Sequence, residues 1–276
     1  MRISYNWLKD YVSLKGLSAE KLAELLTMSG LAVESVVESG GDYIYEIEVT
    51  SNRPDALSVI GVAREAAALT GRKLKMPYSE RRNTQYAIRN TISIKVEEKK
   101  LCPRYTGRVI SGVKVAGSPE RLRARIEAMG LKSVNNIVDI TNFCLFETGE
   151  PMHAFDFDKI SGGEVIIRRA KEGERLVTID GVERTLDDFI LVIADKARPI
   201  AIAGVMGGKE TEVTLSTKTI LLEAAYFDPV SIRRTSRKLS LSTESSYRFE
   251  RKVDIENIAY SSDRAVSLIL LAAGGE

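Results

Sequence analysis

The feature that most constrains this fold is a series of short strand-like segments with helical stretches on either side. Four segments carry the apolar patterns of strands and are separated by turns, most of them containing glycine; they cover residues 163–170, 174–181, 182–186 and 188–195. The helical patterns cover residues 121–130, 133–149, 228–239 and 255–275. Because strands and helices are grouped rather than strictly alternating, the sequence predicts an α+β fold.

A small domain of helices and strands is predicted over residues 1–78. Ser18 is the expected N-cap of a helix whose leucines recur at helical spacing, and Gly30 follows where that helix should end. Two strand-like runs then flank the sequence Ser39-Gly40-Gly41-Asp42, which is a turn signal. A second helix is expected to end at Gly71.

A domain boundary is predicted in residues 76–90, which are polar and lack periodicity. The second domain is expected over residues 86–276 as a larger mixture of strands and helices. Alternating patterns at 91–97 and 104–115 predict its first strands. Ser118-Pro119-Glu120 is expected to open the next helix, with Ser118 as the cap and proline at the first position.

Composition restricts the class of protein. With 44% hydrophobic and 28% charged residues, the sequence is typical of a soluble globular protein. No apolar run reaches the roughly 18 residues of a membrane span, and the N-terminus lacks the pattern of a signal peptide. Cys102 and Cys144 have no metal-ligand or disulfide-framework spacing, which favours a reducing cytoplasm. The net charge of +2 neither requires nor excludes nucleic acid.

The chain has a single histidine, His153. Lone histidines more often act as hydrogen-bonded structural residues than as catalysts. One histidine and two scattered cysteines do not make a zinc site, so no metal is expected. The absence of a Gly-x-Ser-x-Gly elbow disfavours a Ser-His-Asp triad. Taken from the residues alone, structural and catalytic roles for His153 are both open.

Two further stretches allow either a structural or a binding interpretation. Residues 201–208 are rich in small side chains, which suits a tight buried bend or a close approach of the backbone to a ligand. They lack the Lys-Ser/Thr ending of a phosphate loop. Glu223 is a carboxylate inside an apolar run, and a buried carboxylate needs a partner. That partner is either an arginine, the commoner case, or a substrate hydroxyl.

Positive charge is in excess between residues 232 and 252. The candidates for contact with phosphates are Arg233, Arg234, Arg237 and Lys238, followed by Arg248, Arg251 and Lys252. Such an excess suits a phosphate backbone. A solvated helix face or a network of arginines and glutamates explains it equally well.

Taken in order, many segments resemble the β subunit of bacterial phenylalanyl-tRNA synthetase. The blocks that resemble its N-terminal region are Ser4–Tyr11, Leu26–Leu31, Glu48–Leu57 and Gly61–Arg64. The blocks that resemble its editing domain are Cys102–Tyr105, Asn136–Asn142, Pro151–Asp156, Ala203–Gly208, Leu222-Glu223 and Arg248–Arg251. The resemblance covers nearly the whole chain, and these blocks in this order are highly specific.

The sequence departs from the family pattern in three places. The family inserts a tRNA-binding module of the oligonucleotide-binding fold where Gly40-Gly41 stands, so that module is expected to be absent. The chain also stops before the domains that pair with the catalytic α subunit, so no aminoacylation site and no cofactor are expected in it, whereas the complete synthetase would use ATP and Mg²⁺. Ser245-Ser246-Tyr247 stands where the family usually carries a histidine, which weakens any case for a second histidine near the site.

The resemblance implies hydrolytic editing of tRNA(Phe) that carries tyrosine. A pocket shaped for phenylalanine rejects tyrosine by only about a hundredfold. A second site that hydrogen-bonds the hydroxyl discriminates better, because phenylalanine leaves its polar group unpaired. By resemblance, Glu223 reads the hydroxyl, Ala203 leaves room for the phenol, and Gly204 offers a backbone contact.

His153, Thr141 and Asn142 match family positions near the ester. Hydrolysis of an aminoacyl ester needs a positioned water and oxyanion stabilisation rather than a covalent nucleophile, and these three residues are expected to supply them. The expected partners are tyrosyl-tRNA(Phe) and the α subunit, in the cytoplasm and without a membrane. Two other functions are open: a free-standing trans-editing hydrolase, and a non-catalytic RNA-binding or assembly module, against which the complete set of site residues argues.

Overall fold

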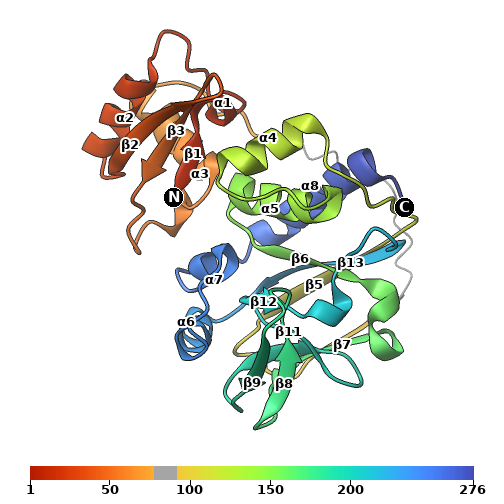
Figure 1. The fold of residues 1–276 in the computed structure, drawn as a ribbon. Coiled ribbons are helices and arrows are strands. Elements are labelled where there is room, and N and C mark those ends of the chain that lie inside the picture. The colour runs from red at the N-terminus through yellow and green to blue at the C-terminus, as the bar shows by residue number, and fades with distance from the viewer. Residues whose placement is uncertain (78–91) are drawn as a thin grey trace.

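The computed structural model describes residues 1–77 and 92–276 (Figure 1). The N-terminal helices and strands lie at one end of the molecule and the later sheets at the other, with helices α5 (Asn136–Thr148) and α8 (Asn257–Ala273) between them. The α+β class predicted from the sequence is confirmed. The boundary predicted at residues 76–90 lies, apart from its first two residues, outside the described part of the chain.

The N-terminal part is an antiparallel sheet covered by helices. Its strands have the order β1-β3-β2. The elements are β1 (Arg2–Ser4), α1 (Tyr5–Leu8), α2 (Ala19–Met28), β2 (Val33–Ser39), β3 (Asp42–Ile47), the 3₁₀ turn η1 (Pro54–Ala56) and α3 (Val59–Thr70). As predicted, Ser18 caps α2 by accepting a hydrogen bond from the backbone N–H of Lys21. Gly71 ends α3 in the left-handed conformation, also as predicted.

The predicted turn at Gly40-Gly41 is a tight hairpin between β2 and β3. Ser39 pairs with Asp42 across it, and the two glycines have φ of +60° and +78°. Positive φ at both central residues gives a turn that matches the twist of the flanking strands, and glycine adopts it without steric strain. The two strands are therefore joined directly, with no inserted module between them.

The second part of the chain contains two larger sheets. One has the order β5-β13-β6 and the other the order β12-β11-β10-β7-β4. Their strands are β4 (Ser93–Val96), β5 (Arg104–Ser111), β6 (Met152–Asp156), β7 (Glu164–Arg169), β10 (Leu191–Ala194), β11 (Pro199–Ile202), β12 (Met206–Gly207) and β13 (Thr219–Tyr226). A separate hairpin consists of β8 (Glu174–Val177) and β9 (Glu183–Leu186). The pairing of β4 with β7 is parallel.

The remaining helices flank these sheets. They are α4 (Glu120–Ala128), α6 (Pro229–Lys238) and α7 (Glu244–Phe249). The cap predicted for α4 is wrong: Ser118 does not bond to the helix, because its hydroxyl donates to the buried carboxylate of Asp139 instead. Helix α5 begins at Asn136, capped by the side chain of Asn135, so it starts three residues later than the predicted helix. Among the residues that the structure describes, no helix combines the length and apolarity needed to span a membrane.

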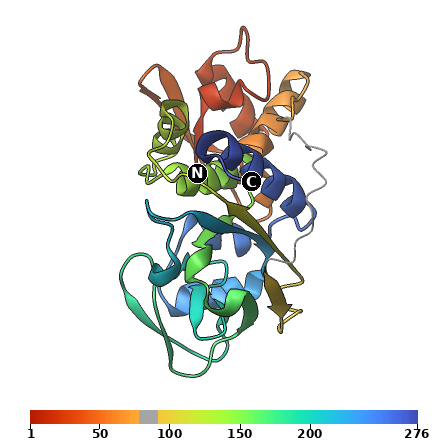
Figure 2. The same cartoon turned by 90° about the vertical axis from the view of Figure 1, so that its right-hand side faces the viewer.

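Strand β13 separates two hydrophobic cores. Alternate residues of a strand point to opposite faces of its sheet. Leu222 and Ala224 belong to the first core, which α5, α8 and the N-terminal helices share. Leu221 and Ala225 belong to the second core, which lies between the two sheets. Figure 2 shows this arrangement, with α8 beside the N-terminal helices and the sheets at the other end.

Polar contacts also join the N-terminal part to the rest of the molecule. The Tyr11 hydroxyl donates to Glu147 of α5 at 2.6 Å. Glu147 is fully buried and also pairs with Arg264 of α8, with 2.9 Å between nitrogen and oxygen. On another element, the buried Arg248 of α7 donates through Nε to the carbonyl of Leu57 at 3.1 Å. Residues 1–77 and 92–276 thus share both a core and buried hydrogen bonds.

Candidate functional site

Strand β13 places Glu223 at the centre of its sheet. In the antiparallel register, Glu223 stands opposite His153 of β6 on one side and Gly107 of β5 on the other. Directly opposed residues of antiparallel strands share a face of the sheet and hold their Cβ atoms about 5 Å apart. Glu223 and His153 are therefore neighbours, and both face the side of the second core.

The carboxyl of Glu223 is buried without a partner. The residue is 6% exposed, and no described residue makes a hydrogen bond or an ion pair with its carboxyl. Burial raises the pKa of this carboxyl to about 8, because desolvation disfavours the charged form. The arginine partner considered from the sequence is not found among the described residues. At neutral pH the group is mostly a neutral acid, which both donates and accepts a hydrogen bond.

The imidazole of His153 is also short of partners. Its Nε2 is buried and makes no hydrogen bond to a described residue. Burial lowers the pKa of the ring to about 4, so it is neutral at physiological pH. Gly207 allows this packing: a Cβ at that position would lie 2.5 Å from Cε1 of the ring. The ring also meets Phe155 edge-on, with centroids 4.5 Å apart.

A cavity of about 390 Å³ opens over these two side chains. Thr141 and Asn142 line it from α5, and Gly204 lines it from the turn between β11 and β12. The hydroxyl of Thr141 donates to the carbonyl of Val138 at 2.8 Å, which leaves its oxygen as an acceptor. Most of the other lining residues are apolar. They include Val134, Val138, Leu145, Met152, Ile179, Ile193, Ile202, Met206 and Phe249.

Gly204 and Ala203 occupy different positions. Gly204 has φ of +66°, and a Cβ there would lie 2.8 Å from Ile232, 2.9 Å from Phe227 and 3.0 Å from Phe249. Ala203 is 1% exposed and packs in the second core, so its side chain does not line the cavity. Of the two residues, Gly204 is therefore the one that lines the cavity.

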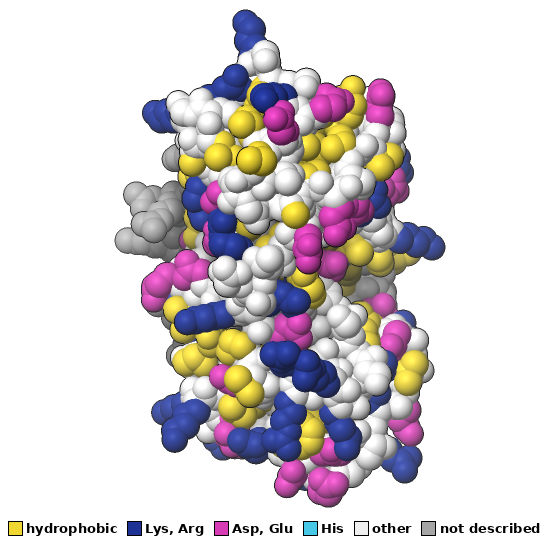
Figure 3. All heavy atoms as spheres, turned by 90° about the vertical axis from the view of Figure 1, so that its left-hand side faces the viewer, with side chains coloured by type: hydrophobic (Ala, Val, Ile, Leu, Met, Phe, Trp, Pro, Cys, Tyr) yellow, Lys and Arg dark blue, Asp and Glu magenta, His cyan; other side chains and the backbone are white. Residues whose placement is uncertain are grey.

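Four of the basic residues predicted to meet phosphates lie on α6, outside the cavity, whereas Arg248 of α7 and Arg251 after it pair with Glu244 and Glu250. Lys238 pairs with Asp187 at 2.8 Å, and the guanidinium of Arg234 lies 3.8 Å above the ring of Phe189. Arg233 and Arg237 are exposed and have no ion-pair partner among the described residues. Figure 3, which faces the side of the molecule where α6 lies, shows Lys and Arg side chains gathered on its lower half.

Two buried polar residues near the site were not singled out from the sequence. Tyr105 of β5 faces the same side of the sheet as Glu223, and its buried hydroxyl makes no hydrogen bond to a described residue. Glu150, just before β6, is 1% exposed with both carboxylate oxygens unpartnered. Burial and then the charge of Glu223 raise the pKa of both groups. The available signal was position: Tyr105 ends the block that begins at Cys102, and Glu150 immediately precedes the block that carries His153.

Residues 101–274 match the model of a family described as the B3/4 domain. This chain belongs to that family. The B3/4 domain therefore contains Glu223, His153 and every other residue that lines the cavity. Within the described residues, no three His, Cys, Asp or Glu side chains are grouped closely enough to hold a metal ion.

The relatives extend beyond the B3/4 domain. The chain is 47% identical, over its full length, to 40% of the phenylalanine–tRNA ligase β subunit of Rhodopirellula baltica. It is 52% identical over 235 residues to the same subunit of Fusobacterium nucleatum, covering 85% of this chain and 29% of that protein. The chain thus spans less than half the length of these relatives, and the resemblance predicted from its sequence blocks is confirmed.

A solved structure was also matched. An N-terminal fragment of the phenylalanyl-tRNA synthetase β subunit from Pyrococcus horikoshii is 18% identical to this chain, with a TM-score of 0.45. The match covers 89% of this chain and 73% of that fragment.

Proposed function

We propose that this chain hydrolyses tyrosyl-tRNA(Phe), as the editing part of a phenylalanine–tRNA ligase β subunit. The identity to β subunits supports the assignment to this enzyme. The observation that carries the proposal is the carboxyl of Glu223, which lines a mostly apolar cavity and makes no hydrogen bond or ion pair with a described residue. A structural carboxyl at such a position would have a partner within the fold.

Selection of tyrosine follows from the state of that carboxyl. The volume of about 390 Å³ lies in the range of small-molecule sites, and the apolar walls suit an aromatic ring. A phenol hydroxyl both donates and accepts a hydrogen bond, and it thus matches the neutral acid of Glu223 in either direction. Phenylalanine would cover the same carboxyl and leave it unpaired and without solvent, which disfavours binding.

The hydrolytic step needs a water at the ester carbonyl. Water adds to the carbonyl carbon, the bond to the ribose oxygen of the tRNA breaks, and that oxygen takes up the proton lost by the water to become a hydroxyl. An imidazole with a pKa of about 4 is a weak base at neutral pH. We therefore assign to His153 the orientation of the water through its unpartnered Nε2, and to Thr141 and Asn142 the positioning of the ester.

The proximity of Glu223 and His153 constrains how tyrosine lies. Neighbouring strands are about 4.8 Å apart, which is shorter than a tyrosyl group from its hydroxyl to its ester. With the phenol on Glu223, the ester lies further along the cavity, toward α5, and the water bridges between it and His153. A histidine that instead contacts the phenol would alter selectivity and not rate alone, so measuring both separates the two roles.

The proposal extends to the partners of the complete enzyme. We infer that the remainder of the protein pairs with an α subunit that uses ATP and Mg²⁺, in the cytoplasm, and that tRNA(Phe) is the shared substrate. Phosphate contacts are assigned first to Arg233 and Arg237, because these two have no ion-pair partner among the described residues, whereas Lys238 is paired with Asp187. Loss of either contact should reduce the log–log salt slope by about 0.7 for a single strand.

The test is deacylation of tyrosyl-tRNA(Phe) and phenylalanyl-tRNA(Phe) by the wild type and by Glu223→Ala. A hydrogen bond is worth about 0.5–3 kcal/mol depending on charge, so kcat/KM for the tyrosyl ester should fall roughly two- to more than hundredfold. The tyrosine-to-phenylalanine ratio should fall with it. Glu223→Gln is the matched control: it keeps the shape and a neutral donor and acceptor, and should retain most of the ratio.

Two results would contradict the proposal. An unchanged ratio in a Glu223→Ala protein that still melts cooperatively assigns Glu223 a structural role. A wild-type rate that does not exceed spontaneous hydrolysis at high protein concentration removes the hydrolase assignment and favours a non-catalytic module. His153→Ala should slow both esters alike, and a change in the ratio would place the imidazole at the phenol.

A further inference from the structure

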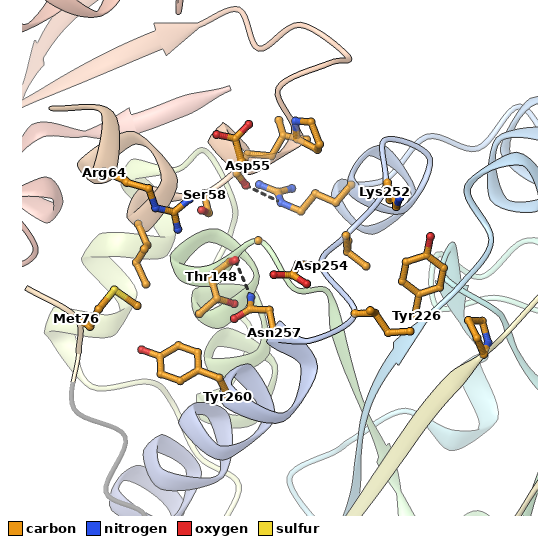
Figure 4. Close-up of a pocket in the computed structure, with 18 residues that line it drawn as sticks. Asp55, Ser58, Arg64, Met76, Thr148, Tyr226, Lys252, Asp254, Asn257 and Tyr260 are labelled. Atoms are coloured by element: carbon orange, nitrogen blue, oxygen red, sulfur yellow. Dashed lines mark hydrogen bonds between the residues drawn. The ribbon is translucent and has the colours of Figure 1, made fainter. Parts of the chain in front are cut away.

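A second cavity lies on the other side of α7 from the Glu223 site. Its volume is about 700 Å³. One wall comes from η1 and the start of α3 in the N-terminal part, and the other from the end of α5, the end of β13 and the loop between α7 and α8 (Figure 4). Arg248 of α7 faces this cleft, whereas Glu244, Ser245 and Phe249 line the Glu223 cavity.

The cleft presents two cations on different walls. Arg64 of α3 and Lys252 of the loop after α7 are exposed, line the cleft, and have no ion-pair partner among the described residues (Figure 4). Two acids also line the cleft: Asp55 pairs with Arg53 at 2.9 Å, and Asp254 accepts a hydrogen bond from the backbone N–H of Glu256 at 3.0 Å. Neither acid forms an ion pair with Arg64 or Lys252, which leaves both cations facing the cleft.

An aromatic ring and an amide also line the cleft. Tyr226, at the end of β13, is partly exposed, and its hydroxyl bonds to no described residue. Asn257 donates to the carbonyl of Thr148 at 3.2 Å, which leaves its own carbonyl oxygen as an acceptor. A π face, an amide edge and separated cations are the groups with which proteins hold unpaired nucleotides.

We propose that this cleft binds a nucleotide within a single strand of RNA. Its base stacks on Tyr226, and its two flanking phosphates meet Arg64 and Lys252. An internal nucleotide fits better than a free anion, because it carries a phosphate on each side and the cations stand on different walls. The choice of RNA rests on the proposed function, whereas the requirement for phosphate and an aromatic base comes from the cleft alone.

The test uses uncharged trinucleotides of adenosine and of uridine with the whole chain, so its outcome does not depend on hydrolysis. Affinity and its salt dependence are measured by titration calorimetry, and the site is located by NMR. Tyr226→Leu should weaken binding roughly five- to hundredfold, as expected of a lost stacking contact, while Tyr226→Phe should retain it. Arg64→Gln and Lys252→Asn should each weaken binding roughly two- to fivefold, the range of exposed ion pairs. Each should also reduce the salt slope by about 0.7.

Lys171→Gln removes the same charge from an exposed position outside both cavities and should change neither affinity nor slope. Cooperative melting of every variant excludes unfolding as the cause of lost binding. The proposal fails if the trinucleotides do not bind or if their signals map to the 390 Å³ cavity. It also fails if inorganic phosphate competes as well as they do, since the cleft would then be a simple anion site. A negative result in these binding experiments does not affect the role proposed for Glu223, because that role is tested by deacylation.

Discussion

The cavity around Glu223 and the cleft around Lys252 lie on two sides of α7. They differ in how far their polar groups are exposed to solvent. The first surrounds the carboxyl of Glu223 and the imidazole of His153 mostly with apolar side chains, so both groups are neutral near pH 7. The second leaves two cations exposed to solvent. One environment favours recognition by a hydrogen bond that excludes water, and the other favours recognition of phosphate charge. A single short helix, α7, therefore separates an apolar environment from a charged, solvent-exposed one.

The two sites also differ at a residue with left-handed backbone. Gly204 has φ of +66° beside the apolar cavity, and Lys252 has φ of +78° beside the cleft. In the first, side chains from three elements fill the space where a Cβ would be. In the second, a lysine occupies a conformation that costs a residue with a side chain about 1–2 kcal/mol. Substitutions at these positions give the sharpest contrast between the regions.

The largest effect is expected at Gly204. Gly204→Ala adds the left-handed cost to a clash with Ile232 and Phe227, for a loss of about 2–4 kcal/mol in the free energy of unfolding. Gly181→Ala is the control, because that glycine has φ of +81° with open space around its Cβ position and should lose only about 1–2 kcal/mol. Urea denaturation of both variants measures the difference. Equal losses would show that the packing around Gly204 relaxes freely.

The second effect is the pH dependence of stability that arises from Glu223 and His153. An acid whose pKa is raised on folding loses stability as pH rises from about 4.5 to 8. Burial lowers the pKa of His153 to about 4, so its contribution to the free energy of unfolding rises with pH instead. This contribution changes only below pH 6.5, the ordinary pKa of a histidine. The two contributions to the free energy of unfolding partly cancel between pH 4.5 and 6.5. Above pH 6.5 only the contribution of Glu223 still changes with pH.

From pH 6.5 to 8, Glu223 should therefore remove about 2 kcal/mol from the free energy of unfolding. Glutamine does not ionise, so the stability of Glu223→Gln relative to the wild type should increase by about 2 kcal/mol between pH 6.5 and pH 8. Glu150 has a raised pKa for the same reason, so a residual slope of the same sign should persist in the variant. Denaturation curves at several pH values check this, and parallel curves for the two proteins would show that Glu223 is ionised in the fold.

The smallest effect is expected in the cleft. Lys252→Gly removes about 1–2 kcal/mol of left-handed strain and adds about 0.5–1 kcal/mol of chain entropy, for a net gain of roughly 0.5 kcal/mol. The melting temperature should rise slightly while trinucleotide affinity falls. A loss of stability would mean that the lysine side chain makes packing contacts that outweigh the strain.

Much of the site could be predicted because its residues stand in recognisable blocks. Glu223, His153, Thr141, Asn142 and Gly204 all line one cavity. Their arrangement could not be predicted, since it depends on β13 pairing with β6, about 70 residues earlier in the chain. Strand β13 itself gave no alternation to recognise, because it is buried on both faces and reads as a continuous apolar run.

The wrong cap at Ser118 and the position of Ala203 have the same kind of cause. Ser118 had the right residue type for a helix cap, but Asp139, from the next helix, takes its hydroxyl. The sequence also suggested Ala203 for a wall of the cavity, whereas the turn after β11 exposes Gly204 and buries its neighbour. In both cases a contact from a distant segment decided between adjacent residues, and local patterns do not contain that information.

The position of β13 between two cores also has a consequence for the evolution of the molecule. Odd-numbered residues around Glu223 face one core and even-numbered residues face the other. Insertion or deletion of a single codon within the strand would exchange the two sets and move the carboxyl to the face of α5 and α8. Length changes in this gene should therefore accumulate in surface loops, such as the one between β8 and β9, and should be absent or come in pairs of residues within β13.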